Sequence, residues 1–318
     1  MKQKILGIIS TTAILLSLFF SSIGPCHASG YPVTITDSDG RKIVIKSPFA
    51  RIISLYPAHT ENLVSLGAGD TLVGISRSSR SIKGIPRGCK TVGYRDDLER
   101  LLALKPDLVI IRPMISRAHP NLVRGLEKSG ITVVSLQPVS PDGLYAYWRK
   151  LGQLTGRQKE AEDMVKSFKK GVEEMRQKVA TIPIQKRPRV YFEAIHRRMK
   201  TFAPGSFQIF CLESAGGINI ASDAQRIRNT NIATYGKERI LAKANQIDVF
   251  LAQKGRMNPV TRQDILNEPG FQVIKAIREG RIYLVDETIV SRPTLRLLQG
   301  MRQIFEILYP DKKRGGLN

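Results

Sequence analysis

One pattern occurs twice in this chain of 318 residues. Residues 98–111 read LERLLALKPDLVII, and residues 237–251 read KERILAKANQIDVFL. Each segment starts around a Glu-Arg pair, continues as an apolar helical turn, crosses a short polar break and ends in an aliphatic run typical of a buried strand. Two such copies, far apart in the chain, indicate two similar lobes. Each lobe presents one glutamate at a matching place, Glu99 or Glu238.

Strand-like and helix-like segments alternate around both copies. Residues 33–45 alternate about an Asp-Gly pair, which predicts a β-hairpin. Further strands are predicted at 52–55, 72–75, 108–111, 131–136, 190–194, 249–252 and 282–285. Helical segments lie between most of them, for example 60–66, which ends at a glycine, and 98–104. This order predicts an α/β fold of mainly parallel sheets with helices on both faces.

The alternation stops between residues 144 and 180, where apolar residues recur at helical spacing among charges and no proline occurs. We interpret this stretch as one or two helices, the second of about twenty residues or more. The predicted organisation is a signal peptide at 1–28, an N-terminal α/β lobe at 29–140, a linking helix at 141–182 and a C-terminal α/β lobe at 183–318. A long helix resists bending, so the lobes should close only modestly.

The first 28 residues have the features of a secretory signal peptide. Lys2 and Lys4 give a basic start, an apolar run covers residues 5–23, and small residues at Cys26 and Ala28 fit a cleavage site. Lipid modification at Cys26 is disfavoured by Pro25 directly before it. The expected location is therefore the periplasm, without a lipid anchor.

The net charge narrows the class of partner, and the positions of the two cysteines in the mature chain bear on whether they form a disulfide. The two lysines of the signal segment reduce the net charge of +23 to +21 in the mature chain. Such basicity favours an anionic partner, but export and the even spread of the bases argue against nucleic acid. Cys89 and Cys211 fall in different lobes, where a disulfide would lock a hinge, so two reduced thiols are predicted.

Several further motifs carry a family resemblance. In the first lobe they are RIISLYPAHTE at 51–61, LVGIS at 72–76 and KPDLVI at 105–110, and in the second FAPG at 202–205, LESAGGIN at 212–219, PGF at 269–271, GRIY at 280–283 and SRP at 291–293. Together they cover nearly the whole mature chain. The sequence resembles the helical-backbone periplasmic binding proteins of ABC importers for ferric siderophores, vitamin B12 and haem. Its motifs are most similar to those of the vitamin B12-binding branch.

The resemblance implies two Rossmann-like α/β lobes joined by a long backbone helix, with a ligand cleft between the lobes. In this family one glutamate on each lobe contacts arginines of the permease dimer, which works with an ATPase. Glu99 and Glu238 match those positions. The alternative is that both acids only stabilise the first turn of a helix. The resemblance also implies a monomer.

The ligand-binding residues are predicted from strand ends and from the family pattern. The resemblance places Tyr94 and Phe202 as aromatic ligand contacts and Asp286 as a polar one. Basic residues after predicted strands suit an anionic chelate, and they are Arg77, Arg80, Arg112, Arg197 and Lys200. The alternatives are solvated surface bases and, for Asp286, an ordinary loop acid.

No catalytic motif stands out, and no metal site is predicted, because His59, His119 and His196 lack a metal-ligand spacing. No cofactor is expected beyond the cargo. The predicted function is capture of a ferric siderophore or cobalamin and its delivery to the permease. The alternatives are a haem carrier that uses Tyr56 or His59 as a ligand, a ligand-binding sensor, and an exported enzyme on the same scaffold.

Overall fold

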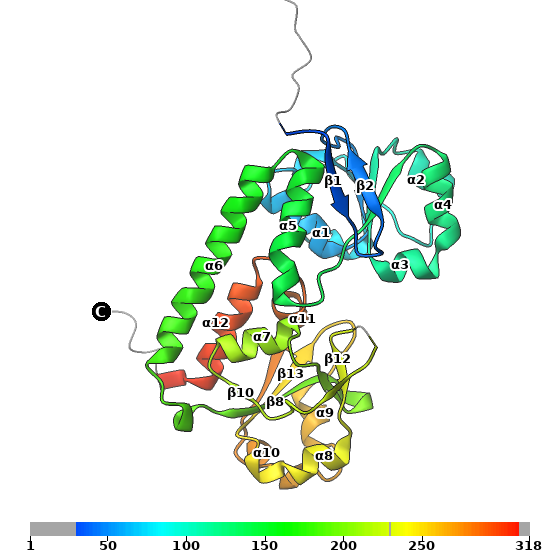
Figure 1. Ribbon diagram of the computed structural model, residues 1–318. Helices are drawn as coiled ribbons and strands as arrows, with labels where there is room; N and C mark the ends of the chain where they lie inside the picture. The colour runs from blue at the N-terminus through cyan, green and yellow to red at the C-terminus, as the bar shows by residue number, and fades with distance from the viewer. Residues whose placement is uncertain (1–29, 229, 312–318) are drawn as a thin grey trace, which may run out of the picture.

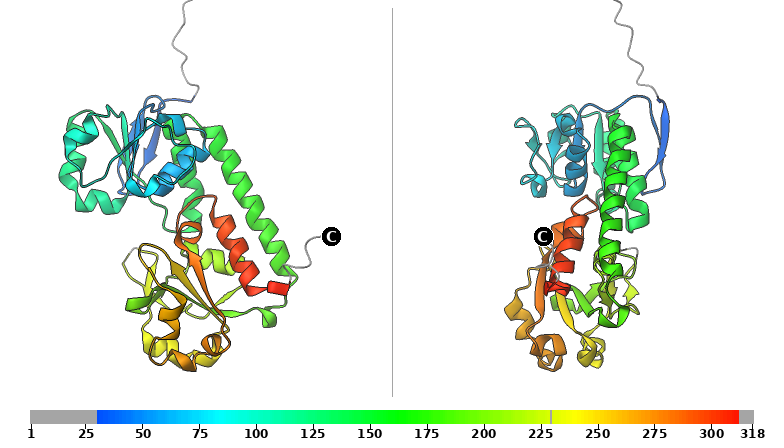
Figure 2. Two further views of the ribbon diagram at one scale, coloured as in Figure 1. Left: turned by 180° about the vertical axis from the view of Figure 1, so that it is seen from behind. Right: turned by 90° about the vertical axis from the view of Figure 1, so that its left-hand side faces the viewer.

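The computed structural model describes residues 30–228 and 230–311. The predicted signal peptide, with Cys26, lies outside the described residues. The described chain forms two lobes, and a long helix, α6 (Gln158–Ala180), runs along one side of both (Figure 1). The views from behind and from the side in Figure 2 show the same arrangement.

The first lobe begins with the predicted hairpin, β1 (Val33–Thr36) and β2 (Lys42–Ile45), which pair antiparallel. A five-stranded parallel sheet follows, in the order β5-β4-β3-β6-β7. Its strands are β3 (Ile52–Ser54), β4 (Leu72–Ile75), β5 (Lys90–Thr91), β6 (Leu108–Ile111) and β7 (Thr132–Ser135). Its helices are α1 (Pro57–Ser65), η1 (Gly69–Thr71), η2 (Arg77–Ser79), α2 (Leu98–Leu102), α3 (Pro113–Ala118) and α4 (Pro120–Lys128).

Two helices connect the lobes where the sequence suggested one linking element at 141–182. The first is α5 (Pro141–Thr155), which ends at Gly156 in the left-handed conformation with φ of 71°. That glycine allows the chain to turn back into α6, which has 23 residues and so confirms the predicted length of about twenty residues or more. Trp148 of α5 and Phe168 of α6 pack edge to face, with ring centroids 5.3 Å apart.

The second lobe is built on a mixed sheet, in the order β11-β12-β9-β8-β13-β14 with β10 beside β8. Its strands are β8 (Arg189–Ile195), β9 (Lys200–Phe202), β10 (Ile218–Asn219), β11 (Gln225–Arg226), β12 (Ile232–Thr234), β13 (Val249–Lys254) and β14 (Ile282–Asp286). Its helices are η3 (Ile184–Lys186), η4 (His196–Arg198), α7 (Phe207–Ser214), α8 (Lys237–Ala242), η5 (Ala244–Gln246), α9 (Arg262–Leu266), η6 (Phe271–Val273), α10 (Lys275–Arg278), α11 (Glu287–Val290) and α12 (Leu297–Leu308).

The prediction of a mainly parallel sheet holds for the first lobe and is wrong for part of the second. Strands β8, β10, β13 and β14 are parallel, but β9, β11 and β12 add antiparallel pairs. The cause is a tight turn after β8, where Met199 takes a left-handed φ of 46° and sends the chain back as β9.

The hydrophobic core continues from one lobe to the other. Each sheet has a separate apolar cluster of its own, whereas the largest cluster contains Ile52 and Ile110 of the first lobe, Trp148 of α5 and Phe192 of the second lobe. Helix α12 approaches α6 closely at Gly171, where an added Cβ would lie 2.7 Å from the Leu298 side chain. A shared core of this kind restricts the movement of one lobe against the other.

Candidate functional site

The carboxyl ends of the two sheets face each other. Strand β3 leads through Tyr56 into α1, and β14 leads through α11 to the segment Ser291–Pro293. Between them, Asn62 Nδ2 donates a hydrogen bond of 2.9 Å to the Pro293 carbonyl, and Arg292 lies 3.9 Å from Glu61. We call Tyr56, Glu61, Asn62, Arg112, Arg292 and Pro293 the lobe contact. In open α/β sheets, ligands bind outside the carboxyl ends of the strands.

Arg112 lies at the switch point of the first sheet. In the sheet, β4 lies beside β3 on one side, and β7 lies beside β6 on the other. The order in which the chain adds strands therefore reverses between β3 and β6. Such a switch point leaves a crevice at the strand ends. Tyr56 follows β3 and Arg112 follows β6, and the Arg112 guanidinium carbon lies 4.2 Å from the Tyr56 ring centroid.

Arg112 keeps an unused donor in this position. Its Nε is buried and has no hydrogen-bond partner among the described residues. Burial raises the pKa of Tyr56, and the positive charges of Arg112 and Arg292 oppose that rise. Glu61 Oε2, which faces Arg292 Nη1 at 3.9 Å, is also buried without a hydrogen bond. Unsatisfied buried polar groups are rare in folded proteins, so this cluster is suited to bind a polar group from outside.

A buried polar network connects Asn62 of the lobe contact with Tyr147, His59 and the Ile111 carbonyl. Tyr147 donates to His59 Nδ1 at 2.8 Å and accepts from Asn62 Nδ2 at 3.1 Å. His59 Nε2 then donates to the Ile111 carbonyl at 3.2 Å, which fixes the neutral tautomer. Burial lowers the pKa of His59 to about 3. Because both ring nitrogens are used, His59 does not serve as a haem ligand in this arrangement.

The buried His59 predicts a pH dependence of stability. The pKa of His59 is lower in the folded chain than in the unfolded chain, so the unfolded chain binds the extra proton and folding free energy is lost as the pH falls below the unfolded value. Between roughly pH 7 and pH 5 this loss is about 2 kcal/mol for one such histidine. Urea unfolding of wild type and His59→Gln should give a clearly shallower pH slope for the variant. Equal slopes would contradict the buried neutral histidine.

Among the described residues, the structure shows no contact between Arg112 and the other residues predicted in the first lobe. Arg77 and Arg80 are exposed, at and just after η2. Tyr94 packs against His119 at a centroid distance of 5.1 Å. Together they line a cavity of about 440 Å³, which is bounded by residues 94–98 and 118–122 and so belongs to the first lobe alone. Ligand contact by Tyr94, Arg77 and Arg80 remains a proposal.

The structure corrects one prediction in the second lobe. Phe202 is fully buried and packs edge to face on Phe192 at 5.0 Å, so it is a core residue and does not present its ring to a ligand. The error comes from the unrecognised hairpin of β8 and β9. Lys200 lies on β9 and donates to Thr234 Oγ1 on the neighbouring strand β12 at 3.2 Å, and ligand contact by Lys200 remains a proposal.

Two more predicted residues of this lobe are solvent-exposed. Arg197 lies in the turn η4 after β8. Asp286 ends β14 and accepts a 2.6 Å hydrogen bond from the Thr288 backbone N–H, so it caps the short helix α11. The cap accounts for an acid at this position without a ligand. Ligand contact by Arg197 or Asp286 remains a proposal.

Sequence reasoning missed most of the lobe contact. Arg292 belongs to the SRP motif, yet nothing in its neighbourhood predicts that it reaches Glu61, which is 231 positions earlier in the chain. The same holds for Asn62 and Pro293. The only available signal was the Arg292-Pro293 pair, a polar residue followed by a proline, which comes after the strand predicted at 282–285.

The two glutamates of the repeat are placed alike. Glu99 and Glu238 are exposed, each in the first turn of its helix, α2 or α8. The adjacent arginines are engaged within their own lobes, Arg100 with Asp96 at 3.3 Å and Arg239 with Asp223 at 2.5 Å. Within residues 30–228 and 230–311, neither Glu99 nor Glu238 forms an ion pair or a hydrogen bond through its carboxylate. Both acids are therefore available to a partner.

Three further findings concern the described residues only. Cys89 and Cys211 are both free thiols, as predicted, and burial raises the pKa of each. No cluster of three or more histidine, cysteine or acidic side chains in residues 30–228 and 230–311 is arranged to hold a metal ion. None of the helices in this part of the chain combines the length and apolar character needed to cross a membrane.

Comparison with known proteins agrees with this architecture. Residues 52–288 match the family described as periplasmic binding protein. An uncharacterised ABC transporter substrate-binding lipoprotein of Bacillus subtilis is 28% identical over 283 residues, which cover 88% of this chain and 87% of the relative. A cobalamin-binding protein of Halobacterium salinarum is 25% identical over 293 residues, covering 87% of this chain and 74% of the relative.

Among solved structures, a possible iron-binding, periplasmic solute-binding protein of Staphylococcus epidermidis superposes with a TM-score of 0.71 at 26% identity. The match covers 83% of this chain and all of the other. The family match extends over most of the residues of both sheets, from β3 to β14. The chain therefore belongs to the periplasmic binding protein family.

Proposed function

We propose that this protein captures a metal chelate outside the cytoplasmic membrane and delivers it to the permease of an ABC importer. Family membership supports a binding role, and the Bacillus subtilis relative is named as an ABC transporter substrate-binding protein. That relative is also named a lipoprotein, so the prediction that Cys26 carries no lipid has no support from it. Binding and release, rather than catalysis, then make up the mechanism.

Arg112 is the observation that carries the proposed ligand chemistry. Its guanidinium lies on Tyr56 at the switch point of the first sheet, and its buried Nε has no partner among the described residues. A guanidinium recognises carboxylate, phosphate, catecholate or hydroxamate oxygens through paired hydrogen bonds. Arg292 adds a second positive charge from the other lobe, close enough to influence Tyr56. The ligand is therefore proposed to be an anionic chelate, such as a ferric siderophore, held between the lobes.

Cobalamin is the second candidate, because the Halobacterium salinarum relative is named a cobalamin-binding protein. Its amide-rich periphery could accept hydrogen bonds from the same arginines. Haem is less well supported, since both nitrogens of His59 are hydrogen-bonded and Tyr56 lies against Arg112.

Replacing Arg112 tests the ligand chemistry. Arg112→Gln should weaken binding of the natural chelate by about tenfold to a hundredfold, because a charge-assisted hydrogen bond contributes about 1.5–3 kcal/mol. Arg117→Gln is the matched control, since Arg117 is exposed on the same helix, α3. Isothermal titration measures both dissociation constants. Equal affinity in the two variants would remove Arg112 from the site.

Delivery is proposed to depend on Glu99 and Glu238. A carboxylate and a guanidinium form a directional pair, so two such pairs would set the orientation of the protein on a permease dimer. The support is the matched exposure of both acids and the engagement of their neighbouring arginines elsewhere. A helix-stabilising role would contribute only about 0.3–1 kcal/mol for each acid.

The transport function is tested in the native host. Cells that lack the gene should lose uptake of one labelled chelate from a panel of ferric siderophores, cobalamin and haem, and the plasmid-borne gene should restore it. Loss of sensing with unchanged uptake would instead favour the sensor alternative. Conversion of the chelate to a new product by the purified protein would favour an enzyme.

A further inference from the structure

Two methionines are exposed on elements that follow the facing strand ends. Met114, the second residue of α3, is 41% exposed, and Met257, in the connection from β13 to α9, is 45% exposed. The other methionines in residues 30–311 are buried or half-buried: Met164, Met175, Met199 and Met301. An exposed methionine is individually unremarkable, so the position of this pair decides whether it has a role.

The two methionines follow corresponding strands of the two lobes. The repeated sequence forms α2 and β6 in the first lobe and α8 and β13 in the second. Met114 lies three positions after Ile111, the last residue of β6, and Met257 lies three positions after Lys254, the last residue of β13. An arginine lies shortly before each methionine, Arg112 or Arg256.

Both strands neighbour the strands that lead to the lobe contact. β6 pairs with β3, which runs into Tyr56, and β13 pairs with β14, which runs into α11 and Arg292. Because parallel strands end at the same edge of a sheet, each methionine follows a strand adjacent to one that leads to the lobe contact, one in each lobe.

The loop that carries Met257 packs against α11, the helix that leads to Arg292 of the lobe contact. Gly255 lies close to the Glu287 side chain of α11, since an added Cβ would lie 2.1 Å from the carboxylate. Glu287 in turn is near Tyr56: burial is the main cause that raises the pKa of Tyr56, Arg112 lowers it, and the charge of Glu287 raises it. The β13–α9 connection thus packs on a residue whose charge acts on Tyr56 of the first lobe.

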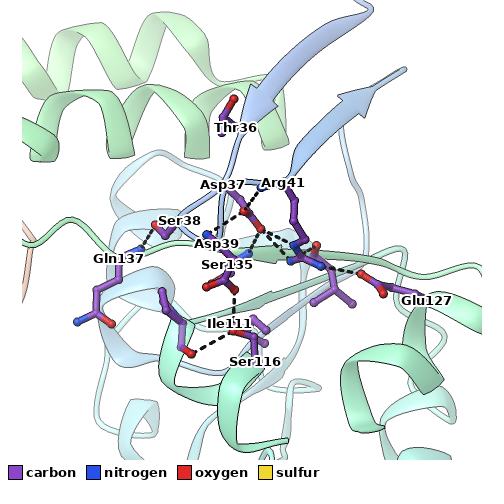
Figure 3. Close-up of polar contacts among 12 residues, drawn as sticks. Thr36, Asp37, Ser38, Asp39, Arg41, Ile111, Ser116, Glu127, Ser135 and Gln137 are labelled. Atoms are coloured by element: carbon purple, nitrogen blue, oxygen red, sulfur yellow. Dashed lines mark hydrogen bonds and ion pairs between the residues drawn. The ribbon is translucent and has the colours of Figure 1, made fainter. Parts of the chain in front are cut away.

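The helix that carries Met114 is braced by the hairpin, as Figure 3 shows. Ser116 of α3 donates to Asp39 at 2.6 Å, and the Gln137 backbone N–H donates to Ser38 at 2.9 Å. The hairpin turn is itself fixed, because the buried Asp37 carboxylate accepts from the Arg41 guanidinium and from the Ser135 backbone N–H. Both methionines are therefore presented by well-anchored segments.

We propose that Met114 and Met257 are the apolar ligand contacts of the two lobes, and that the ligand is an anion with a broad polarisable face. This inference rests on the proposed function and names the chemistry of its ligand. The thioether is unbranched and polarisable, so it adapts to a flat or irregular apolar surface. The arginines beside the methionines supply charge complementarity, and the methionines supply the apolar area that binding sites for small molecules require.

Methionine oxidation tests the assignment. Hydrogen peroxide transfers one oxygen atom to a thioether, the O–O bond breaks and water leaves. In the free protein Met114 and Met257 should be oxidised first, with Met199 as a slower internal reference. Peptide mass spectrometry then repeats the measurement with cyanocobalamin, a ferric hydroxamate, a ferric catecholate and haemin. The probe that binds should slow oxidation of both methionines by at least about tenfold and leave Met199 unchanged.

Variants give a second readout that does not depend on peroxide. Met114→Gln with Met257→Gln should weaken binding of the same probe by at least about tenfold, whereas the double leucine variant should retain affinity. The control is Val44→Gln with Val273→Gln, two exposed apolar residues on β2 and η6. Unchanged affinity in the methionine-to-glutamine variant, or unchanged oxidation in a complex that forms, would overturn the inference and leave the proposed function intact. If none of the probes bound, both the inference and the proposed function would fail.

Discussion

Replacing Glu99 and Glu238 together with alanine is expected to abolish transport while ligand affinity stays within about twofold of wild type. Both side chains are exposed and have no ion-pair partner among the described residues, so their removal leaves no buried group unsatisfied. The lost free energy is that of the two proposed carboxylate–guanidinium contacts with the permease, about 1.5–3 kcal/mol each. The helices should remain folded, because a first-turn acid contributes less than about 1 kcal/mol.

The matched control removes two first-turn acids that are far from α2 and α8. Asp142 lies in the first turn of α5 and Glu160 in that of α6. Their double alanine variant should transport like wild type in cells that lack the chromosomal gene. If the Glu99 and Glu238 variant also transported normally, with equal amounts of protein outside the membrane, the docking proposal would fail.

Trp148→Ala should cause the largest loss of stability of any single substitution considered for this chain, about 3–5 kcal/mol. Trp148 is fully buried and belongs to the core shared by the two lobes. It packs on Phe168 at 5.3 Å and donates from Nε1 to the Pro293 carbonyl at 3.3 Å. Truncation would create a cavity between α5, α6 and the second lobe and would also remove one hydrogen bond of the lobe contact.

Trp148→Phe separates these two contributions. The phenyl ring keeps most of the contact with Phe168 but cannot donate to Pro293, so the expected cost is about 1–2 kcal/mol. Urea unfolding, followed by circular dichroism, measures both free energies. A loss below about 1 kcal/mol for Trp148→Ala would show that the tryptophan does not hold the lobes together as its burial indicates.

The sequence predicted elements whose signals are local. Gly67 ended α1 as expected, because a left-handed glycine commonly terminates a helix. The Asp-Gly pair at Asp39 and Gly40 lay in the hairpin turn. The aliphatic run before Arg112 formed a fully buried central strand, β6, with neighbours on both sides. In each case the pattern over a few residues determines the structure.

Features that depend on unusual turns or on distant contacts were not predictable in this way. The hairpin of β8 and β9 turns at Met199, whose left-handed φ of 46° has no signal in the sequence His196–Lys200 because glycine and asparagine are absent. Missing this turn led to the wrong role for Phe202. Arg292 reached the site through the packing of two lobes, which no local pattern encodes.

Native mass spectrometry of the mature protein tests the central claim most directly. The protein is mixed with equimolar cobalamin, several ferric siderophores and haem, and the intact complexes are weighed. The account predicts one dominant complex, a single chelate bound one to one, which Arg112→Gln weakens and Arg117→Gln does not. If the spectrum contains only the free protein, even at chelate concentrations far above the dissociation constants usual for transport, capture of a metal chelate would be contradicted.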